Sequence, residues 1–201
     1  MQHYFDSDPA SPARRRQVEA TIWGHDLTFT TATGVFSHDG LDHATKVLLR
    51  AVEPPASGTV LDLGCGWGPI ACALAHARPA LDVWAVDTNS RARDLTRENA
   101  KNLGAHLHVA RPDQVPADLR FDQIWSNPPI RIGKDALHDL LLEWLPRLRP
   151  DGVAWLVVGK NLGADSLARW LGKAGWPTER HASAKGFRVL AVRPETVRPS
   201  S

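Results

Sequence analysis

The 201-residue sequence contains only two cysteines and no hydrophobic run that approaches the length of a membrane span. Two cysteines cannot form a disulfide framework, so we expect Cys65 and Cys72 to be reduced and buried. A transmembrane helix needs about 18 consecutive apolar residues, and their lack excludes a membrane protein. The N-terminus also lacks the basic and apolar segments of a secretory signal. We therefore expect a cytoplasmic protein.

Strong charge of one sign is also missing. The formal charge at pH 7 is only +2, which permits a polyanionic partner without requiring one. Nine histidines are present, but none stands in a metal-like spacing with the cysteines, so we expect no metal site. The remaining composition, with 43% hydrophobic residues, is typical of a globular domain with its own core.

Residues 1–55 differ in composition from the rest of the chain and are expected to form an N-terminal extension. Between Trp23 and Thr33, apolar residues among threonines suggest a short strand pair. A helix is expected to follow over 41–52, where apolar residues share one helical face, and Pro54-Pro55 would end it.

From Thr59 onward, short apolar strands alternate with helices. We expect strands at 59–63, 82–86, 107–109, 121–125, 153–158, 178–181 and 187–192, and helices at 69–77, 90–103, 134–145 and 164–171. This alternation predicts an α/β fold with a mostly parallel sheet covered on both faces, because right-handed crossovers place the helices there. The main domain is expected to span 56–194, and 195–201 to form a flexible tail.

The most specific feature is a glycine-rich turn after the first of these strands, Asp62-Leu63-Gly64-Cys65-Gly66-Trp67-Gly68. Alternate glycines allow a tight turn and close approach of the backbone to a ligand, and the next helix directs its N-terminus at that ligand. The spacing is one residue shorter than the dinucleotide fingerprint. Asp87 ends the second strand about 20 residues later, where a carboxylate can bind both hydroxyls of a ribose. The two features predict a nucleotide-like cofactor.

A second motif, Ser126-Asn127-Pro128-Pro129-Ile130, follows the fourth strand. In an open α/β sheet this end of the strand faces the ligand crevice, so Asn127 is expected to lie opposite the cofactor. The two prolines stiffen the backbone and remove two amide donors, which leaves carbonyl oxygens to meet a substrate. Two acceptors on an exocyclic amine would favour a pyramidal nitrogen and direct its lone pair. The motif therefore suits an amine nucleophile.

From about Thr59 to Val192 the sequence resembles the class I methyltransferases that use S-adenosylmethionine, through the glycine turn and Asp87. The resemblance implies a Rossmann-like, mostly parallel seven-stranded sheet with a reversed last strand. It implies that Asp62 reaches the cofactor's ammonium, Asp87 its ribose and Asp113 its adenine edge. The other cofactor contacts are expected from Gly64, Cys65, Gly66, Trp67, Gly68 and Asn127, with Trp67 lining the pocket.

The Asn-Pro-Pro motif is shared by methyltransferases that act on amines of adenine, guanine and protein glutamine. The resemblance implies that Asn127, Pro128, Pro129 and Ile130 form the catalytic segment. The fourth residue of the motif is usually aromatic and stacks on the planar target, whereas here it is Ile130. Another side chain would then have to contact the base, and Phe36 is the candidate.

A narrower resemblance is to the RsmC-like enzymes, which methylate a guanine exocyclic amine in small-subunit ribosomal RNA. It rests on segments over nearly the whole chain: Gly34-Val35-Phe36-Ser37 with Leu41-Asp42, and residues 127–134, 160–164 and 185–187. It implies methylation of guanine N2 in 16S ribosomal RNA, with ribosomal RNA or the small ribosomal subunit as partner. Some family members carry a second, degenerate methyltransferase-like domain before the catalytic one. We expect no such second domain here. Extension 1–55, which is expected to cover the active site, or a folded ribosomal particle would then provide RNA docking.

Basic residues are expected at the mouth of the crevice. Arg131, Lys134 and Lys160 follow the ends of adjacent strands, where they suit phosphate contacts, and Arg14, Arg15 and Arg16 would add charge from the extension. Two other functions stay open: a protein-glutamine or small-molecule amine methyltransferase, and a non-catalytic RNA-binding protein with a relic cofactor pocket. Naked ribosomal RNA and an assembled subunit are both candidate substrates, and the sequence is compatible with a monomer.

Overall fold

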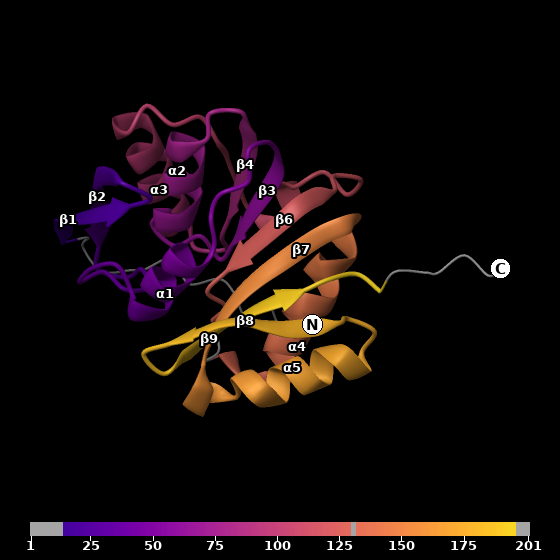
Figure 1. Ribbon diagram of the computed structural model, residues 1–201. Coiled ribbons are helices and arrows are strands. Elements are labelled where there is room, and N and C mark those ends of the chain that lie inside the picture. The colour runs from indigo at the N-terminus through magenta and orange to yellow at the C-terminus, as the bar shows by residue number, and fades with distance from the viewer. Residues whose placement is uncertain (1–13, 130–131, 196–201) are drawn as a thin grey trace.

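The computed structural model describes residues 14–129 and 132–195. Its centre is a seven-stranded sheet with the order β5-β4-β3-β6-β7-β9-β8 (Figure 1). The strands are β3 (Gly58–Leu63), β4 (Leu81–Val86), β5 (His108–Ala110), β6 (Phe121–Ser126), β7 (Leu148–Gly159), β8 (Thr178–Ala184) and β9 (Phe187–Val192). β9 is antiparallel to both of its neighbours, and the other pairs are parallel. The predicted α/β class and the reversed last strand are confirmed.

Helices cover both faces of this sheet. They are α1 (His43–Ala51), α2 (Pro69–Ala77), α3 (Ser90–Asn102), α4 (Lys134–Trp144) and α5 (Ala164–Lys173). The buried side chains of α1, α2 and α3 join one hydrophobic cluster, and those of α4 and α5 join a second cluster on the opposite face (Figure 1). Within the described residues, no helix combines the length and hydrophobicity that a membrane span requires.

Strand β7 begins earlier than its apolar run predicts. Leu148 pairs with Phe121, and the next pair joins Val153 to Gln123, so the register shifts between the two pairs. The intervening Pro150-Asp151-Gly152 is typical of a turn, and here it is accommodated as an irregularity inside the strand. The expected start at 153 was therefore five residues too late.

The N-terminal extension contains an antiparallel hairpin of β1 (Arg15–Ile22) and β2 (His25–Ala32). Its two-residue turn is Trp23-Gly24, and both residues have positive φ angles, 47° and 81°, as a type I′ turn requires. The predicted strand pair exists, but its position within 23–33 was wrong, because Trp23 forms the turn and β1 lies before it. Only Val18 and Ile22 of β1 are buried, and the strand begins with three exposed polar residues, which obscured it in the sequence.

The hairpin and the main domain share a single hydrophobic core on this face. Phe29 of β2 is buried in the same cluster as side chains of α2 and α3. The buried Asn99 of α3 pairs with the free edge of β2, since its Oδ1 accepts the Thr30 N–H (2.7 Å) and its Nδ2 donates to the Thr30 carbonyl (2.8 Å). The same Nδ2 also donates to the Trp67 carbonyl in the glycine turn (2.8 Å). Asn99 therefore joins the extension to the turn that the sequence assigns to a cofactor.

We expect Asn99→Ala to destabilise the protein by about 2–4 kcal/mol, because three hydrogen bonds are lost and the half-buried backbone groups of Thr30 and the buried Trp67 carbonyl lose a partner. The free energy of unfolding in urea measures this. Asn102→Ala, at an exposed position of the same helix, is the control and should change that free energy by no more than about 0.5 kcal/mol. Similar losses in both variants would contradict the structural role of Asn99.

Candidate active site

Three strand ends bring the two sequence motifs together. The carboxyl ends of β4, β3 and β6 are level in the sheet, and Gly64, Asp87 and Asn127 are the residues that directly follow them. The Ser126 hydroxyl at the end of β6 donates to the carbonyl of Leu63 at the end of β3 (2.7 Å). The glycine turn and the Asn-Pro-Pro segment, far apart in the sequence, therefore lie on neighbouring strands at one edge of the sheet.

The three glycines of the turn have different surroundings. Gly64, Gly66 and Gly68 all have positive φ angles (76°, 58° and 87°), which side chains rarely adopt. A Cβ at Gly64 or Gly66 would meet no heavy atom of the described residues within 4 Å, whereas a Cβ at Gly68 would lie 2.8 Å from Thr96 and 3.0 Å from Cys72 Sγ. The first two glycines thus leave the turn open to a ligand. The third allows the start of α2 to pack against α3.

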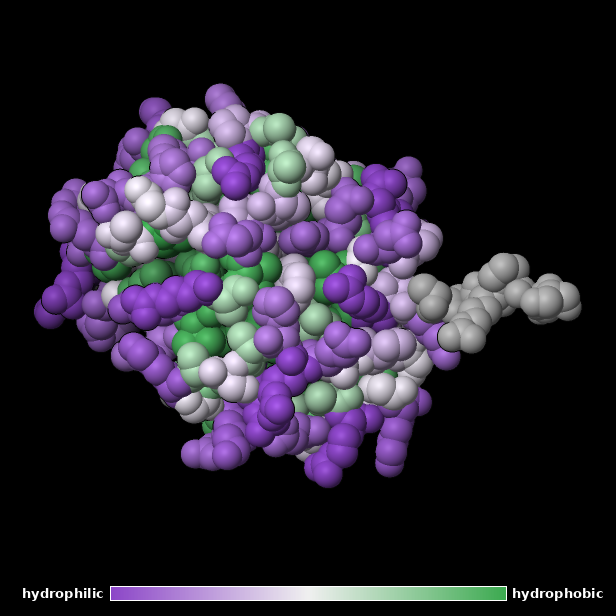
Figure 2. Space-filling model, in the orientation of Figure 1, coloured by the Kyte–Doolittle hydropathy of each residue, from purple (hydrophilic) through white to green (hydrophobic). Residues whose placement is uncertain are grey.

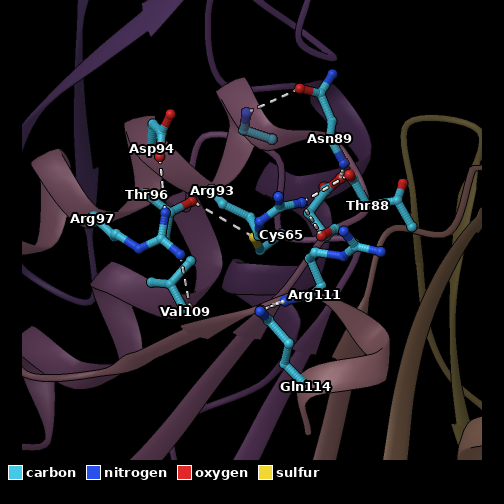
Figure 3. A network of polar contacts seen from close by, with 12 residues as sticks. Cys65, Thr88, Asn89, Arg93, Asp94, Thr96, Arg97, Val109, Arg111 and Gln114 are labelled. Carbon is cyan, nitrogen blue, oxygen red and sulfur yellow. Dashed lines mark hydrogen bonds and ion pairs between the residues drawn. The ribbon is translucent and has the colours of Figure 1, made fainter. Parts of the chain in front are cut away.

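The side chains between these glycines point into the protein. Cys65 is buried, and its sulfur lies 3.6 Å from the hydroxyl of Thr96, beside which Figure 3 shows it. Trp67 is only 1% exposed, packs edge-on against Phe29 and donates its indole N–H to the Ser37 carbonyl (3.3 Å). This burial leaves the backbone atoms of Cys65 and Trp67, rather than their side chains, for contact with a ligand at the turn.

Both cysteines are free and buried, as predicted. Burial raises the pKa of the Cys65 and Cys72 thiols, and the carboxylates nearby add to this effect. Neutral thiols of this kind behave as small packing residues rather than as nucleophiles.

Asp62 lies beneath the turn and is 1% exposed. Its Oδ2 accepts the backbone N–H of Ala71 in α2 (3.0 Å), and its Oδ1 has no hydrogen-bond partner among the described residues. Burial raises the pKa of Asp62 to about 7; the bond from Ala71 opposes this shift, and the charge of Asp87 adds to it. A buried carboxyl group with one unpartnered oxygen is suited to bind a cation.

Asp87 is held from both sides by backbone donors. Its Oδ2 accepts the Gly66 N–H and its Oδ1 the Asn89 N–H, both at 2.9 Å. Burial raises the pKa of Asp87, while these two bonds and the nearby Arg93 guanidinium oppose the shift. Arg93 also donates to the carbonyls of Asp87 and Thr88, both at 2.8 Å, and Figure 3 shows it extending toward Thr88. Each carboxylate oxygen keeps a lone pair for a ligand hydroxyl.

The side chain of Asn127 is oriented by the N-terminal extension. Its Nδ2 donates to Oδ2 of Asp42 (2.9 Å) and to Oγ1 of Thr45 (3.1 Å). A carboxylate only accepts hydrogen bonds, so Asp42 defines which end of the amide carries the nitrogen. Within the described part of the chain, the Asn127 side-chain oxygen has no hydrogen bond, and it remains available as an acceptor.

Asp42 has a second role in the local structure. It is the N-cap of α1, and its Oδ2 also accepts the backbone N–H groups of Ala44 (2.9 Å) and Thr45 (3.3 Å). Its place before an apolar helix is a recognisable N-cap signal. The contact with Asn127 was not predicted, and no local pattern reveals it.

The prolines after Asn127 differ in exposure. Pro128 is buried and Pro129 is exposed, and the Pro129 carbonyl accepts the backbone N–H of Ile132 (3.0 Å). Ile130 and Arg131, to which the sequence assigns catalytic and substrate-binding roles, lie outside the described residues.

Phe36 stands on the loop between β2 and α1, and its side chain is 62% exposed. Asn89, after β4, donates its side-chain N–H to the Gly34 carbonyl (3.0 Å), and Trp67 donates to the Ser37 carbonyl. The loop is therefore attached to the glycine turn and to the end of β4, which brings Phe36 to the same edge of the sheet as the motifs.

The predicted charged contacts are more widely spread. Lys134 at the start of α4 and Lys160 directly after β7 are both exposed. Asp113 lies in a short 3-10 helix after β5, is exposed, and pairs with Arg111 (3.1 Å). In the extension, Arg15 pairs with Glu98 and Arg16 with Asp39. Among residues 14–129 and 132–195, no group of three or more His, Cys, Asp or Glu side chains is arranged to hold a metal ion.

Comparisons with known proteins point to one family. Residues 26–191 match the model of the methyltransferase small domain family. The uncharacterized protein YbxB of Bacillus subtilis is 32% identical over 197 residues, which are 96% of this chain and 98% of that protein. The ribosomal RNA small subunit methyltransferase C of Citrobacter koseri is 38% identical over 117 residues, 55% of this chain and 34% of that protein.

A solved structure matches over a larger part of the chain. It is a 16S rRNA N2 methyltransferase (RsmC) of T. thermophilus in complex with AdoMet and guanosine, with a TM-score of 0.76 and 25% identity. The match covers 92% of this chain and 52% of that one. The chain thus spans about half the length of this enzyme and about a third of the Citrobacter relative.

The raised pKa of Asp62 predicts a pH-dependent stability. The pKa rises from 3.8 to about 7 on folding, so the protonated group stabilises the fold below about pH 4, and this stabilisation is lost as the pH rises through 7. Asp62→Asn removes the titration while keeping an acceptor for Ala71. The variant should be more stable than the parent at about pH 8, by a margin that shrinks by roughly 2–4 kcal/mol toward pH 4.

Urea unfolding at several pH values measures this margin. Asp118→Asn, at an exposed position, is the control and should follow the parent at every pH. An identical pH profile for Asp62→Asn and the parent would show that Asp62 does not titrate as a buried acid.

Proposed function

Because the chain belongs to the methyltransferase small domain family, we propose that it transfers a methyl group from S-adenosylmethionine to the exocyclic amine (N2) of a guanine in 16S ribosomal RNA. The observation that carries this proposal is the oriented amide of Asn127 at the sheet edge beside an open glycine turn, whose oxygen accepts no hydrogen bond from any described residue. The AdoMet and guanosine bound by the T. thermophilus relative support both the cofactor and the substrate class. We propose the cytoplasm as its location.

The residues at the turn fit S-adenosylmethionine, which supplies an electrophilic methyl group on a sulfonium when bound. Asp62 Oδ1, which has no hydrogen-bond partner among the described residues, suits the ammonium group, because a nearby cation favours the ionised carboxylate. The rigid carboxylate of Asp87 suits the two ribose hydroxyls. The open sides of Gly64 and Gly66 leave room for the methionine portion. We assign the adenine edge to the region of Asp113.

Asn127 and the proline segment orient the amine. We assign the Asn127 side-chain oxygen to one N–H of the guanine amine and the Pro128 carbonyl to the other, since the Pro129 carbonyl already accepts from Ile132. Two acceptors oppose delocalisation of the nitrogen lone pair into the ring and direct it toward the glycine turn. The amine becomes acidic only as it is methylated, so the segment needs no strong base. Its contribution is orientation.

The extension contributes to substrate binding in this proposal. Phe36 offers an exposed aromatic ring on a loop at the sheet edge, and it can contact the flat face of the base. Asp42 and Thr45 reach Asn127 from the same extension. We therefore propose that residues 1–55 cover the active site of domain 56–194, with Lys134 and Lys160 near phosphates. A guanine inside a helix must be turned out of its stack to reach this site. Turning out an unpaired guanine costs less free energy, because no base pair has to be broken.

Asn127→Ala should separate transfer from cofactor binding. The rate of methyl transfer should fall by about 10²–10³-fold, because an acceptor that orients the amine is lost, while cofactor affinity should fall far less than in Asp87→Ala. Asp87→Ala is the matched comparison and should weaken cofactor binding by about tenfold or more, because both ribose hydrogen bonds are lost.

Calorimetry gives the cofactor affinities. Transfer is measured with tritiated S-adenosylmethionine offered to purified 16S ribosomal RNA, to small ribosomal subunits and to ribosomal protein. Turnover by Asn127→Ala at the parental rate would remove Asn127 from the reaction. Label in protein instead of RNA would replace the proposed substrate with a protein amine.

Asp42 should act as a positioning residue. Asp42→Ser keeps a good N-cap for α1 but loses the carboxylate that holds Asn127, so kcat should fall by about tenfold or more with unchanged cofactor affinity and nearly unchanged stability. Asp42→Asn can still accept from Asn127 and should recover part of the lost kcat. If Asp42→Ser lowered only the free energy of unfolding, or only raised KM, with kcat unchanged, Asp42 would merely cap the helix.

A further inference from the structure

A groove between α1 and the β8–β9 hairpin lies outside the residues assigned to the reaction. Its volume is about 220 Å³, smaller than the roughly 300–1,000 Å³ of pockets that enclose drug-sized ligands. It is lined by His43, Lys46, Val47, Arg50, Ala51, Ala182, Ala184 and Lys185. Three of these eight residues are permanently cationic and none is acidic, so the groove suits an anionic chain passing along it rather than an enclosed small molecule.

The basic residues of α1 form one stripe. His43, Lys46 and Arg50 are spaced three and four residues apart, which places them on one face of the helix, and all three are exposed. Lys185 faces the same groove from the β8–β9 turn and is also exposed. We refer to the groove lined by His43, Lys46, Arg50 and Lys185 as the basic groove.

The cations of the basic groove are not neutralised inside the protein. In the described part of the chain, Lys46, Arg50 and Lys185 form no ion pair, whereas Arg15 and Arg16 of the hairpin are both paired. Glu53, which follows α1, and Glu179 of β8 do not line the groove, and neither forms an ion pair with a described residue. Three unpaired cations around one groove are complementary to a series of phosphates.

The floor of the groove is small and apolar. Val47, Ala51 and Ala182 have no polar side-chain atoms, so no side chain of the floor competes with a bound backbone for the cations. Figure 2 shows a hydrophobic area crossed and bordered by elongated hydrophilic side chains where Figure 1 places α1 and the β8–β9 hairpin. A sugar-phosphate backbone can lie on such a floor with its phosphates toward the rims.

The basic groove begins beside the proposed active site. His43 follows Asp42, which binds Asn127, and the Lys160 N–H donates to the Gly186 carbonyl (2.7 Å), attaching the β8–β9 turn to the end of β7. From His43 to Arg50 the helix rises about 10 Å. Stacked nucleotides cover this length in about three steps of 3.4 Å.

We propose that the basic groove binds the phosphodiester backbone of the RNA strand that flanks the target nucleotide. This inference rests on the proposed function, which requires RNA at the adjacent site, and it adds the path by which the strand leaves that site. Contacts of this kind determine the position of the strand without reading its sequence. The groove thus supplies RNA binding from within the catalytic chain.

The test compares two double variants of equal charge change. Lys46→Ala/Arg50→Ala alters the groove, and Lys101→Ala/Lys173→Ala removes two exposed cations from α3 and α5 as a control. Binding of a fluorescent single-stranded RNA of about a dozen nucleotides is measured by anisotropy over a range of salt concentrations. The groove variant should bind about tenfold more weakly, and its dependence of log affinity on log salt should be shallower by about 0.7 for each lost contact.

Cofactor affinity, measured by calorimetry, should be equal in the parent and both variants. No RNA binding by the parent, equal RNA affinity of the parent and the groove variant, or an equal loss in the control variant would overturn the assignment. Competition by poly-glutamate as effective as that by RNA would replace RNA with an acidic protein as the ligand. RNA binding through the groove without methyl transfer to RNA would refute the proposed function but not the groove assignment. Methyl transfer to RNA together with parental RNA affinity in the groove variant would refute the groove assignment but not the proposed function.

Discussion

The hydrogen bond from the Asn127 amide to the Asp42 carboxylate is the contact on which the site depends. It joins segments 85 residues apart, and it converts a flexible amide into one with a defined donor end and a defined acceptor end. Since Asp42 also caps α1, the position of that helix determines the direction in which the Asn127 oxygen points. The described part of the extension therefore contributes to the candidate site, and its core is continuous with that of the main domain.

Most of the fold follows from local sequence patterns. The helix over Pro69–Ala77 was predicted with its observed ends, because a glycine turn and a proline in the first turn mark its start clearly. The boundaries that failed lie where tertiary pairing overrides local preference. Pro150-Asp151-Gly152 reads as a turn but sits within β7, and β1 is recognisable only once its partner β2 is in place. The number of strands in the sheet and the reversed last strand followed only from the family resemblance, and the order of the strands was not predicted.

In the candidate site, too, local features could be predicted from the sequence and long-range contacts could not. The tight turn at Gly64 and Gly66 was predictable, because an open turn with positive φ angles needs glycine. Trp67 was expected to line the pocket, yet its side chain serves the core under the hairpin. Asn99 and Asp42 were not assigned roles, because their partners are distant in sequence and no spacing rule connects them. Long-range polar contacts of this kind need the assembled structure.

The packing of α1 has a consequence for synthesis of the protein. This helix carries the anchor of Asn127, and it packs against β7, β8 and β9, the last three strands of the sheet. A nascent chain that has emerged only as far as Asn127 has the glycine turn and the amide but no platform for the helix that orients them. The candidate site is therefore complete only when the C-terminal strands β7, β8 and β9 have formed.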